Sequence, residues 1–262
     1  MAAPNEITAT QLNRLIGTPD CPTIVDVRID DDFAEDPRII PTAFRHSHTD
    51  LAALLPKLGS NRVVVSCHKG LKLSQGTAAL LRAEGVACEI LQCGHVGWAN
   101  AELPLIKPMT PNSLWVTKHH PKIDRIACPW LIRRFIDPAA QFMFVAPSQV
   151  TAVAEKFNAI AFDVPDCEWT HVGDRCTFDA LLSGFDLNAP ALAHMARIIR
   201  AADTDTLNQE PEAAGLLALS LGLSRMYRDD LEQLHHGLHL YDALYRWARD
   251  ATDETHIWED RT

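Results

Sequence analysis

The chain has 262 residues, of which 47% are hydrophobic and 22% are charged, a composition typical of a globular protein long enough for two domains. Its formal net charge is -10 at pH 7, so its field repels polyanions, and neither nucleic acid nor a membrane is expected as a partner. The sequence shows no membrane-spanning apolar run, no signal peptide and no CxxC motif, so its seven cysteines are expected to be reduced thiols of a cytoplasmic protein.

Three β-branched runs in the first half, at residues 23–27, 62–66 and 88–91, are predicted to be strands. The segment 73–85 has the spacing of an amphipathic helix that ends at Gly85. A strand, a helix and a strand within about 30 residues form a right-handed βαβ unit, so these strands are expected to be parallel. Loops at the carboxyl ends of such strands commonly hold the chemistry, and Cys67 lies in one of them.

Three prolines, Pro104, Pro108 and Pro111, interrupt both helix and strand hydrogen bonding and predict a linker that ends near residue 111. Residues 1–111 contain 10 basic and 12 acidic side chains, against 14 and 22 in residues 112–262. The net charges are therefore -2 and -8, and the acidic second half disfavours a DNA-binding regulator.

The second half is rich in helical patterns. Helices are predicted at residues 124–137, 191–203 and 228–250, and strands at 141–146 and 159–164. The expected fold is therefore an α/β parallel-sheet domain over residues 1–111, followed by a mostly helical α+β domain over residues 112–262.

Cys67 begins a loop that leads into the predicted helix. Unpaired backbone N–H groups and the positive end of the helix favour a thiolate there and bind anions. His68, Lys69 and Lys72 add positive charge, and Gly70 lets the backbone curl with its N–H groups inward. An activated cysteine beside an anion site is the favoured interpretation, and a small buried thiol is the alternative.

Four segments of the first half resemble, in this order, the landmarks of a rhodanese domain over about residues 8–106: IVDVR (24–28), RIIPTAF (38–44), SCHKGLKLS (66–74) and LQCGHVGW (91–98). The resemblance implies a rhodanese-like α/β fold in which the loop cysteine takes a sulfane sulfur from a donor anion such as thiosulfate. The persulfide then passes this sulfur to a thiol acceptor or to cyanide, without a cofactor. Cys67 matches the persulfide cysteine, Asp26 and Arg28 match a supporting strand-end pair, and Trp98 matches a packing aromatic.

The resemblance also implies an anion-binding loop made of His68, Lys69, Gly70, Leu71, Lys72, Leu73 and Ser74. The loop is one residue longer than the commonest sulfurtransferase loop, a length shared with phosphatase-like and arsenate-reducing relatives, so the substrate stays open. Those relatives have an arginine six residues after the cysteine, where this chain has Leu73. Phosphate transfer is therefore disfavoured, because the main positive charge that would bind the oxyanion is missing. Cys93, expected at the same sheet edge, is interpreted as a bystander rather than a sulfur-accepting thiol.

Three segments of the second half, 115–138, 161–182 and 198–223, resemble the C-terminal domain of chromate-resistance proteins of the ChrB type, over about residues 113–250. The resemblance implies a role in chromate resistance or sensing, with chromate as a further candidate partner. The favoured function is thus a sulfurtransferase associated with oxyanion resistance. The alternative is a non-enzymatic sensor of chromate, of a metal or of redox state.

Asp163, His171, Cys176 and Asp203 are metal-capable side chains expected at strand and helix ends, where ligands from separate elements converge. Their spacing matches no metal signature. Two interpretations of these residues therefore stay open. They bind a metal in the second domain, or they are a hydrogen-bonded histidine and aspartates that cap helices.

Two further groups of the second half are interpreted as structural. His235 and His239 share one helical face but lack the acid of an HExxH motif, so a solvated histidine pair is favoured over zinc ligands. Arg125, Arg133 and Arg134 have the donors to grip an oxyanion, but in so acidic a domain pairing with carboxylates is favoured.

Overall fold

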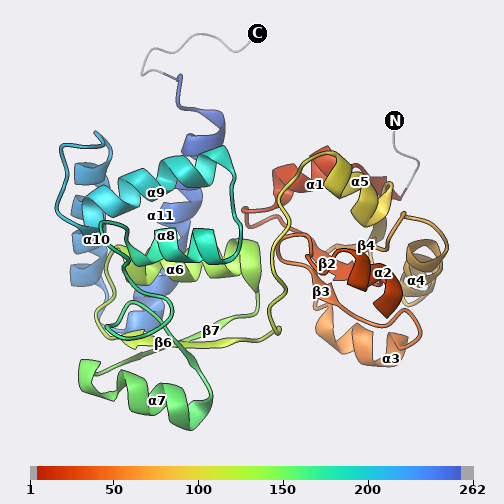
Figure 1. Ribbon diagram of the computed structural model, residues 1–262, viewed down its shortest axis with the longest axis horizontal. Coiled ribbons are helices and arrows are strands. Elements are labelled where there is room, and N and C mark those ends of the chain that lie inside the picture. Colours follow the sequence, from red (N-terminus) through yellow and green to blue (C-terminus); the bar gives the residue numbers. More distant parts are fainter. Residues whose placement is uncertain (1–4, 255–262) are drawn as a thin grey trace.

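The computed structural model describes residues 5–254 and shows two halves side by side (Figure 1), the first coloured red to yellow and the second green to blue. Five parallel strands form the first sheet, in the order β1-β5-β4-β2-β3. They are β1 (Glu6–Ile7), β2 (Thr23–Asp26), β3 (Phe44–Arg45), β4 (Val63–Ser66) and β5 (Cys88–Leu91). The three predicted strands are therefore confirmed as β2, β4 and β5, and their parallel pairing is confirmed with them.

Helices lie around this sheet in the first half (Figure 1). They are α1 (Ala9–Leu15), α2 (Asp30–Glu35), α3 (Leu51–Leu54) with a short 3-10 turn (Leu55–Lys57), α4 (Lys72–Ala83) and α5 (Gly94–Asn100). Helix α4 is the predicted crossover helix between β4 and β5. It ends just before Gly85, whose φ of 82° leaves the helical region as the stop signal requires.

The first part of the proline-rich segment 104–111 packs against the first half of the chain. Ile39 and Ile106 exchange backbone hydrogen bonds of 2.9 and 2.8 Å, and Ile106 is fully buried. The indole N–H of Trp98, also fully buried, donates to the Pro104 carbonyl at 2.8 Å. This part of the predicted linker is thus pinned to the first half.

Among the described residues, the second half forms a three-stranded parallel sheet of order β7-β6-β8 and six α-helices. The strands are β6 (Leu114–Lys118), β7 (Gln141–Val145) and β8 (Ile160–Ala161). The helices are α6 (Asp124–Leu131), continued as a π-helix (Ile132–Ile136), α7 (Val150–Phe157) after a 3-10 turn (Pro147–Gln149), α8 (Thr177–Gly184), α9 (Pro190–Asp203), α10 (Ala213–Met226) and α11 (Asp230–Asp250). In Figure 1, α7 lies on one side of the sheet and α6, α8 and α9 on the other.

Two predicted elements of this half change form. The predicted helix 124–137 becomes α6 followed by a π-helix, and Pro129 lies inside it, where a proline removes a backbone donor and disturbs regular hydrogen bonding. The predicted strand 159–164 is reduced to β8, because Asp163 has a φ of 53° and turns the chain out of the sheet. Strand β6 and helices α7, α8 and α10 have no predicted counterpart.

The two halves share one continuous apolar core. Ile16 of the first half belongs to the same buried cluster as Trp130, Phe135 and Tyr245 of the second. A backbone hydrogen bond of 3.0 Å from Thr42 to the Phe135 carbonyl joins them as well. Over residues 5–254, no helix combines the length and the apolar character needed to cross a bilayer.

Candidate functional site

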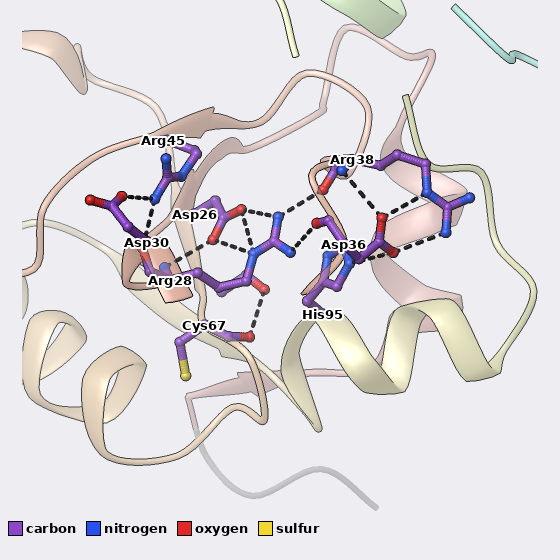
Figure 2. Close-up of polar contacts among 9 residues, drawn as sticks. Asp26, Arg28, Asp30, Asp36, Arg38, Arg45, Cys67 and His95 are labelled. Carbon is purple, nitrogen blue, oxygen red and sulfur yellow. Dashed lines mark hydrogen bonds and ion pairs between the residues drawn. The ribbon is translucent and has the colours of Figure 1, made fainter. Parts of the chain in front are cut away.

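Cys67 lies at the carboxyl edge of the first sheet. Strand β4 is buried on both faces and ends at Ser66, and α4 begins at Lys72, so the thiol starts the short loop between them. The residue is 4% exposed. Figure 2 shows its sulfur directed away from the neighbouring network of aspartates and arginines.

The surroundings of the thiol are rich in unpaired donors. The Sγ atom of Cys67 is 3.2 Å from the hydroxyl oxygen of Ser74, which in turn lies 3.2 Å from the Leu71 carbonyl. Within the described part of the chain, the backbone N–H groups of residues 68–73 donate to no acceptor. Such groups at the start of a helix form a site for an anion.

Two exposed lysines of this loop are available to attract an incoming anion. Lys69 and Lys72 are exposed, and neither forms an ion pair with any residue in 5–254. The His68 ring instead lies 3.6 Å from the carboxylate of Glu35. Leu73 packs against the apolar core below the loop, so the position where phosphatase-like relatives carry an arginine serves packing here.

Two glycines allow the loop to sit against the turn that follows β5. Gly70 and Gly94 have φ values of 69° and 57°, in the left-handed region. A Cβ atom on Gly94 would collide with the Cys67 carbonyl, which accepts a hydrogen bond of 2.9 Å from the backbone of His95. The close approach of these backbones therefore requires glycine.

Gly94→Ala is accordingly expected to destabilise the protein by more than about 1 kcal/mol and to lower any activity of the loop, because its backbone can no longer seat against Cys67. Gly76→Ala is a matched control, since Gly76 lies in α4 with open space around it and alanine favours a helix by about 0.5–1 kcal/mol. Thermal unfolding of the two variants should shift in opposite directions.

A buried ion pair lies at the end of β2, where Asp26 is paired with Ser66 at the end of β4. Arg28 donates to the Asp26 carboxylate through Nε at 2.8 Å and Nη2 at 2.6 Å, and both side chains are almost fully buried. The same guanidinium donates to the carbonyls of Asp36 and Arg38 at 2.8 and 2.7 Å (Figure 2). The predicted strand-end pair thus ties β2 to the segment that leads to β3.

A second polar contact near this pair has no predicted counterpart. The Nε2 atom of His95 in α5 is 3.0 Å from Oδ2 of Asp36 (Figure 2). Burial lowers the pKa of His95, while the hydrogen bond from Arg38 lowers that of Asp36. The two partners lie 59 residues apart, and no local pattern signals their contact.

Cys93 is exposed and precedes α5 with a φ of 60°. It lies at the predicted edge of the sheet, since a Cβ on Gly70 would meet the Cys93 backbone nitrogen at 2.9 Å. Its interpretation as a bystander thiol stays a prediction.

Three of the four metal-capable residues meet in the second half. Asp163, His171 and Asp203 converge, and Asp124, the first residue of α6, joins them. Cys176 is completely buried beside this group, and its sulfur lies 3.5 Å from the Asp179 carboxylate. Burial raises the pKa of the Cys176 thiol. The donor atoms that lie within 4.8 Å of one another come from Asp124, Asp163 and His171 and not from Cys176.

The carboxylates of this cluster repel one another. Burial, followed by the charges of Asp203 and Asp163, raises the pKa of Asp124. Burial and Asp163 raise that of Asp203. Arg125 offsets one charge through an Nε–Oδ2 distance of 3.2 Å to Asp163.

The sequence predicts that the arginines of the second half pair with carboxylates and that His235 and His239 are solvated, and the structure agrees except at Arg133. Arg134 forms an ion pair of 2.7 Å with Asp242, as Arg125 does with Asp163. Arg133 is an exception, because its Nε donates to the Ala140 carbonyl instead of a carboxylate. The pair of residues His235 and His239 is exposed to solvent.

A family model for the C-terminal domain of ChrB matches residues 115–248, just over half of the chain. The chain belongs to the ChrB C-terminal domain family. A second model, for the rhodanese-like domain, matches residues 8–101. Protein ChrB of Cupriavidus metallidurans is 35% identical over 132 residues, which cover 50% of this chain and only 39% of that protein.

Solved structures of rhodanese-related proteins are similar to part of the chain. A thiosulfate sulfurtransferase from Pseudomonas aeruginosa is 27% identical over 40% of this chain and 21% of its own, with a TM-score of 0.35. A rhodanese-like domain protein from Staphylococcus aureus is 23% identical over 36% of this chain and 91% of its own, with a TM-score of 0.33.

Proposed function

We propose that the rhodanese-like domain of this chain is a sulfurtransferase in which Cys67 carries sulfur as a persulfide. The observation that carries the proposal is a thiol at the start of a loop whose backbone N–H groups, from residue 68 to residue 73, find no acceptor among the described residues. These donors stabilise both a thiolate and an incoming dianion. The activity needs no cofactor, and a reducing cytoplasm would keep the thiol available.

The reaction runs in two displacements. The Cys67 thiolate attacks the outer sulfur of thiosulfate, the sulfur–sulfur bond of the donor breaks, and sulfite leaves with the bonding electron pair. The acceptor, a thiolate or cyanide, then attacks the outer sulfur of the persulfide and releases the Cys67 thiolate. The Ser74 hydroxyl, which donates to the Leu71 carbonyl and lies 3.2 Å from the Cys67 sulfur, can turn to donate a hydrogen bond to either anionic form.

Leu73 supports sulfur transfer over phosphate transfer. A phosphate ester needs a guanidinium that grips several oxygens, and the side chain at this position is apolar and packed inward. Lys69 and Lys72 act instead as exposed point charges that attract the donor. The ChrB domain connects this activity with resistance to chromate, itself a tetrahedral dianion.

The test of the proposal is direct detection of the persulfide. The reduced full chain is incubated with thiosulfate, and intact mass spectrometry should show the gain of one sulfur atom, which peptide mapping places on Cys67. Cyanide should remove that sulfur and form thiocyanate. A chain that gains no sulfur, or gains it on Cys93, would refute the assignment.

Chromate is expected to compete with thiosulfate at the Cys67 loop, because the two dianions share charge and shape. Lys72→Ala should weaken this competition about fivefold, the effect of about 1 kcal/mol from one exposed charge, whereas Lys107→Ala should not. Initial rates with short exposure separate binding from thiol oxidation. Unchanged inhibition by chromate in Lys72→Ala would move the oxyanion site away from this loop and favour a sensor function of the second domain.

A further inference from the structure

The cluster of Asp124, Asp163, His171 and Asp203 is built from four separate elements of the ChrB domain. Asp124 opens α6, Asp163 follows β8 at a φ of 53°, His171 lies in the loop before α8, and Asp203 ends α9. Four segments that are far apart in the sequence thus each contribute one side chain to the cluster.

His171 stands at the centre of the group. Its Nε2 atom lies 3.2 Å from Asp203 Oδ2, 3.5 Å from Asp163 Oδ1 and 3.6 Å from Asp124 Oδ2. One donor atom each from Asp124, Asp163 and His171 lie within 4.8 Å of one another, a spacing that one ion can bridge.

A second observation concerns Asp124 alone. This residue is 1% exposed, and its Oδ1 atom has no hydrogen-bond partner among residues 5–254. Its Oδ2 atom accepts a hydrogen bond of 2.6 Å from the Thr177 backbone, so the carboxylate is oriented through one oxygen while the other is left unpaired. A buried, unpartnered carboxylate oxygen is costly unless something absent from the protein chain satisfies it.

Helix capping explains only part of the arrangement. At the start of α8, Thr177 donates its backbone N–H to Asp124 at 2.6 Å and its hydroxyl to Asp163 at 3.1 Å. Those bonds leave further oxygens free and do not account for three neighbouring carboxylates. Arg125 is the one guanidinium paired within the described cluster, and it contacts Asp163.

We infer that Asp124, Asp163, His171 and Asp203 bind a divalent first-row transition metal ion such as Mn²⁺, Fe²⁺ or Zn²⁺. Carboxylate oxygens suit hard cations, and the imidazole favours transition metals over Mg²⁺. Soft ions such as Cu⁺ are disfavoured, because the four side chains offer carboxylate oxygens and one imidazole nitrogen and no sulfur.

The site opens to solvent on one side. The side chain of His171 is 39% exposed and Val172 beside it is 65% exposed, whereas Asp124 forms the closed end. An ion can therefore enter past the His171 loop and keep coordination positions for water or a small ligand. The site is separate from the Cys67 loop, so it does not depend on the proposed sulfur transfer.

The test starts with the purified full chain, whose metal content is measured by elemental analysis. After treatment with a chelator, the chain is titrated with Mn²⁺, Zn²⁺ and Mg²⁺ by calorimetry. We expect one equivalent of Mn²⁺ or Zn²⁺ to bind, more tightly than Mg²⁺, and to raise the melting temperature. His171→Ala should weaken binding by about 100-fold. Asp174→Asn, an exposed carboxylate on the same loop, is the matched control and should bind as the wild type does.

A variant of Asp124 separates metal binding from a purely structural role. Asp124→Asn keeps an oxygen for the Thr177 backbone and removes one of the repelling charges. The metal-free variant should melt no lower than the wild type, yet gain nothing from added metal. Absence of binding to the wild type, or equal affinity in wild type, His171→Ala and Asp124→Asn, would overturn the site.

Discussion

Cys67→Ser is expected to lower the rate of sulfur transfer from thiosulfate to cyanide by on the order of 10³-fold or more, to the uncatalysed background. A serine hydroxyl cannot accept a sulfane sulfur as a stable persulfide. The fold should survive, because the serine keeps the size of the buried side chain and can share a hydrogen bond with Ser74. The rate of thiocyanate formation measures the first effect and thermal unfolding the second.

Cys93→Ser is the matched control for this variant, since Cys93 is the exposed thiol near the same edge of the sheet. We expect it to keep near wild-type activity. A Cys67→Ser protein that still forms thiocyanate at a comparable rate would exclude Cys67 as the sulfur carrier. Loss of activity in Cys93→Ser alone would assign the chemistry to the turn after β5.

Arg28→Ala is expected to destabilise the fold by about 3–5 kcal/mol, the usual effect of breaking a buried ion pair. The variant leaves the Asp26 carboxylate charged and buried without its guanidinium, and it frees the carbonyls of Asp36 and Arg38. Urea unfolding of the full chain measures the loss as a lower midpoint.

Two further variants show whether the unpaired charge causes this loss. Arg62→Ala breaks a partly exposed pair with Glu89, in which the Arg62 side chain is 44% exposed, and should cost at most about 1 kcal/mol. Asp26→Asn combined with Arg28→Met should cost less than Arg28→Ala, because it leaves no charge unpaired. A double variant as unstable as Arg28→Ala would mean that the hydrogen bonds to the 36–38 segment, rather than the charge, stabilise this region.

The strands around Cys67 were accessible from the sequence because their signals are local. A buried parallel strand has a short run of apolar, often β-branched residues in its sequence, and such a run is present in each of β2, β4 and β5. Strands β1 and β3 have two residues each, too short for any pattern to emerge. The predicted helix 124–137 changes to a π-helix at Ile132, shortly after Pro129, and the effect of a proline on helix geometry depends on the packing around it.

The Cys67 loop could be predicted from the sequence, because its parts are neighbours along the chain: a strand, a thiol, a glycine with positive φ, two lysines and the start of a helix. The contact of Asp124 with His171, and its place beside Asp163 and Asp203, could not be predicted in this way, since these residues come from four elements that meet through packing. From the sequence alone, an aspartate at the start of a helix is predicted to cap that helix. The burial of Asp124 among like charges depends instead on the long-range contacts that bring α6, α8 and α9 together.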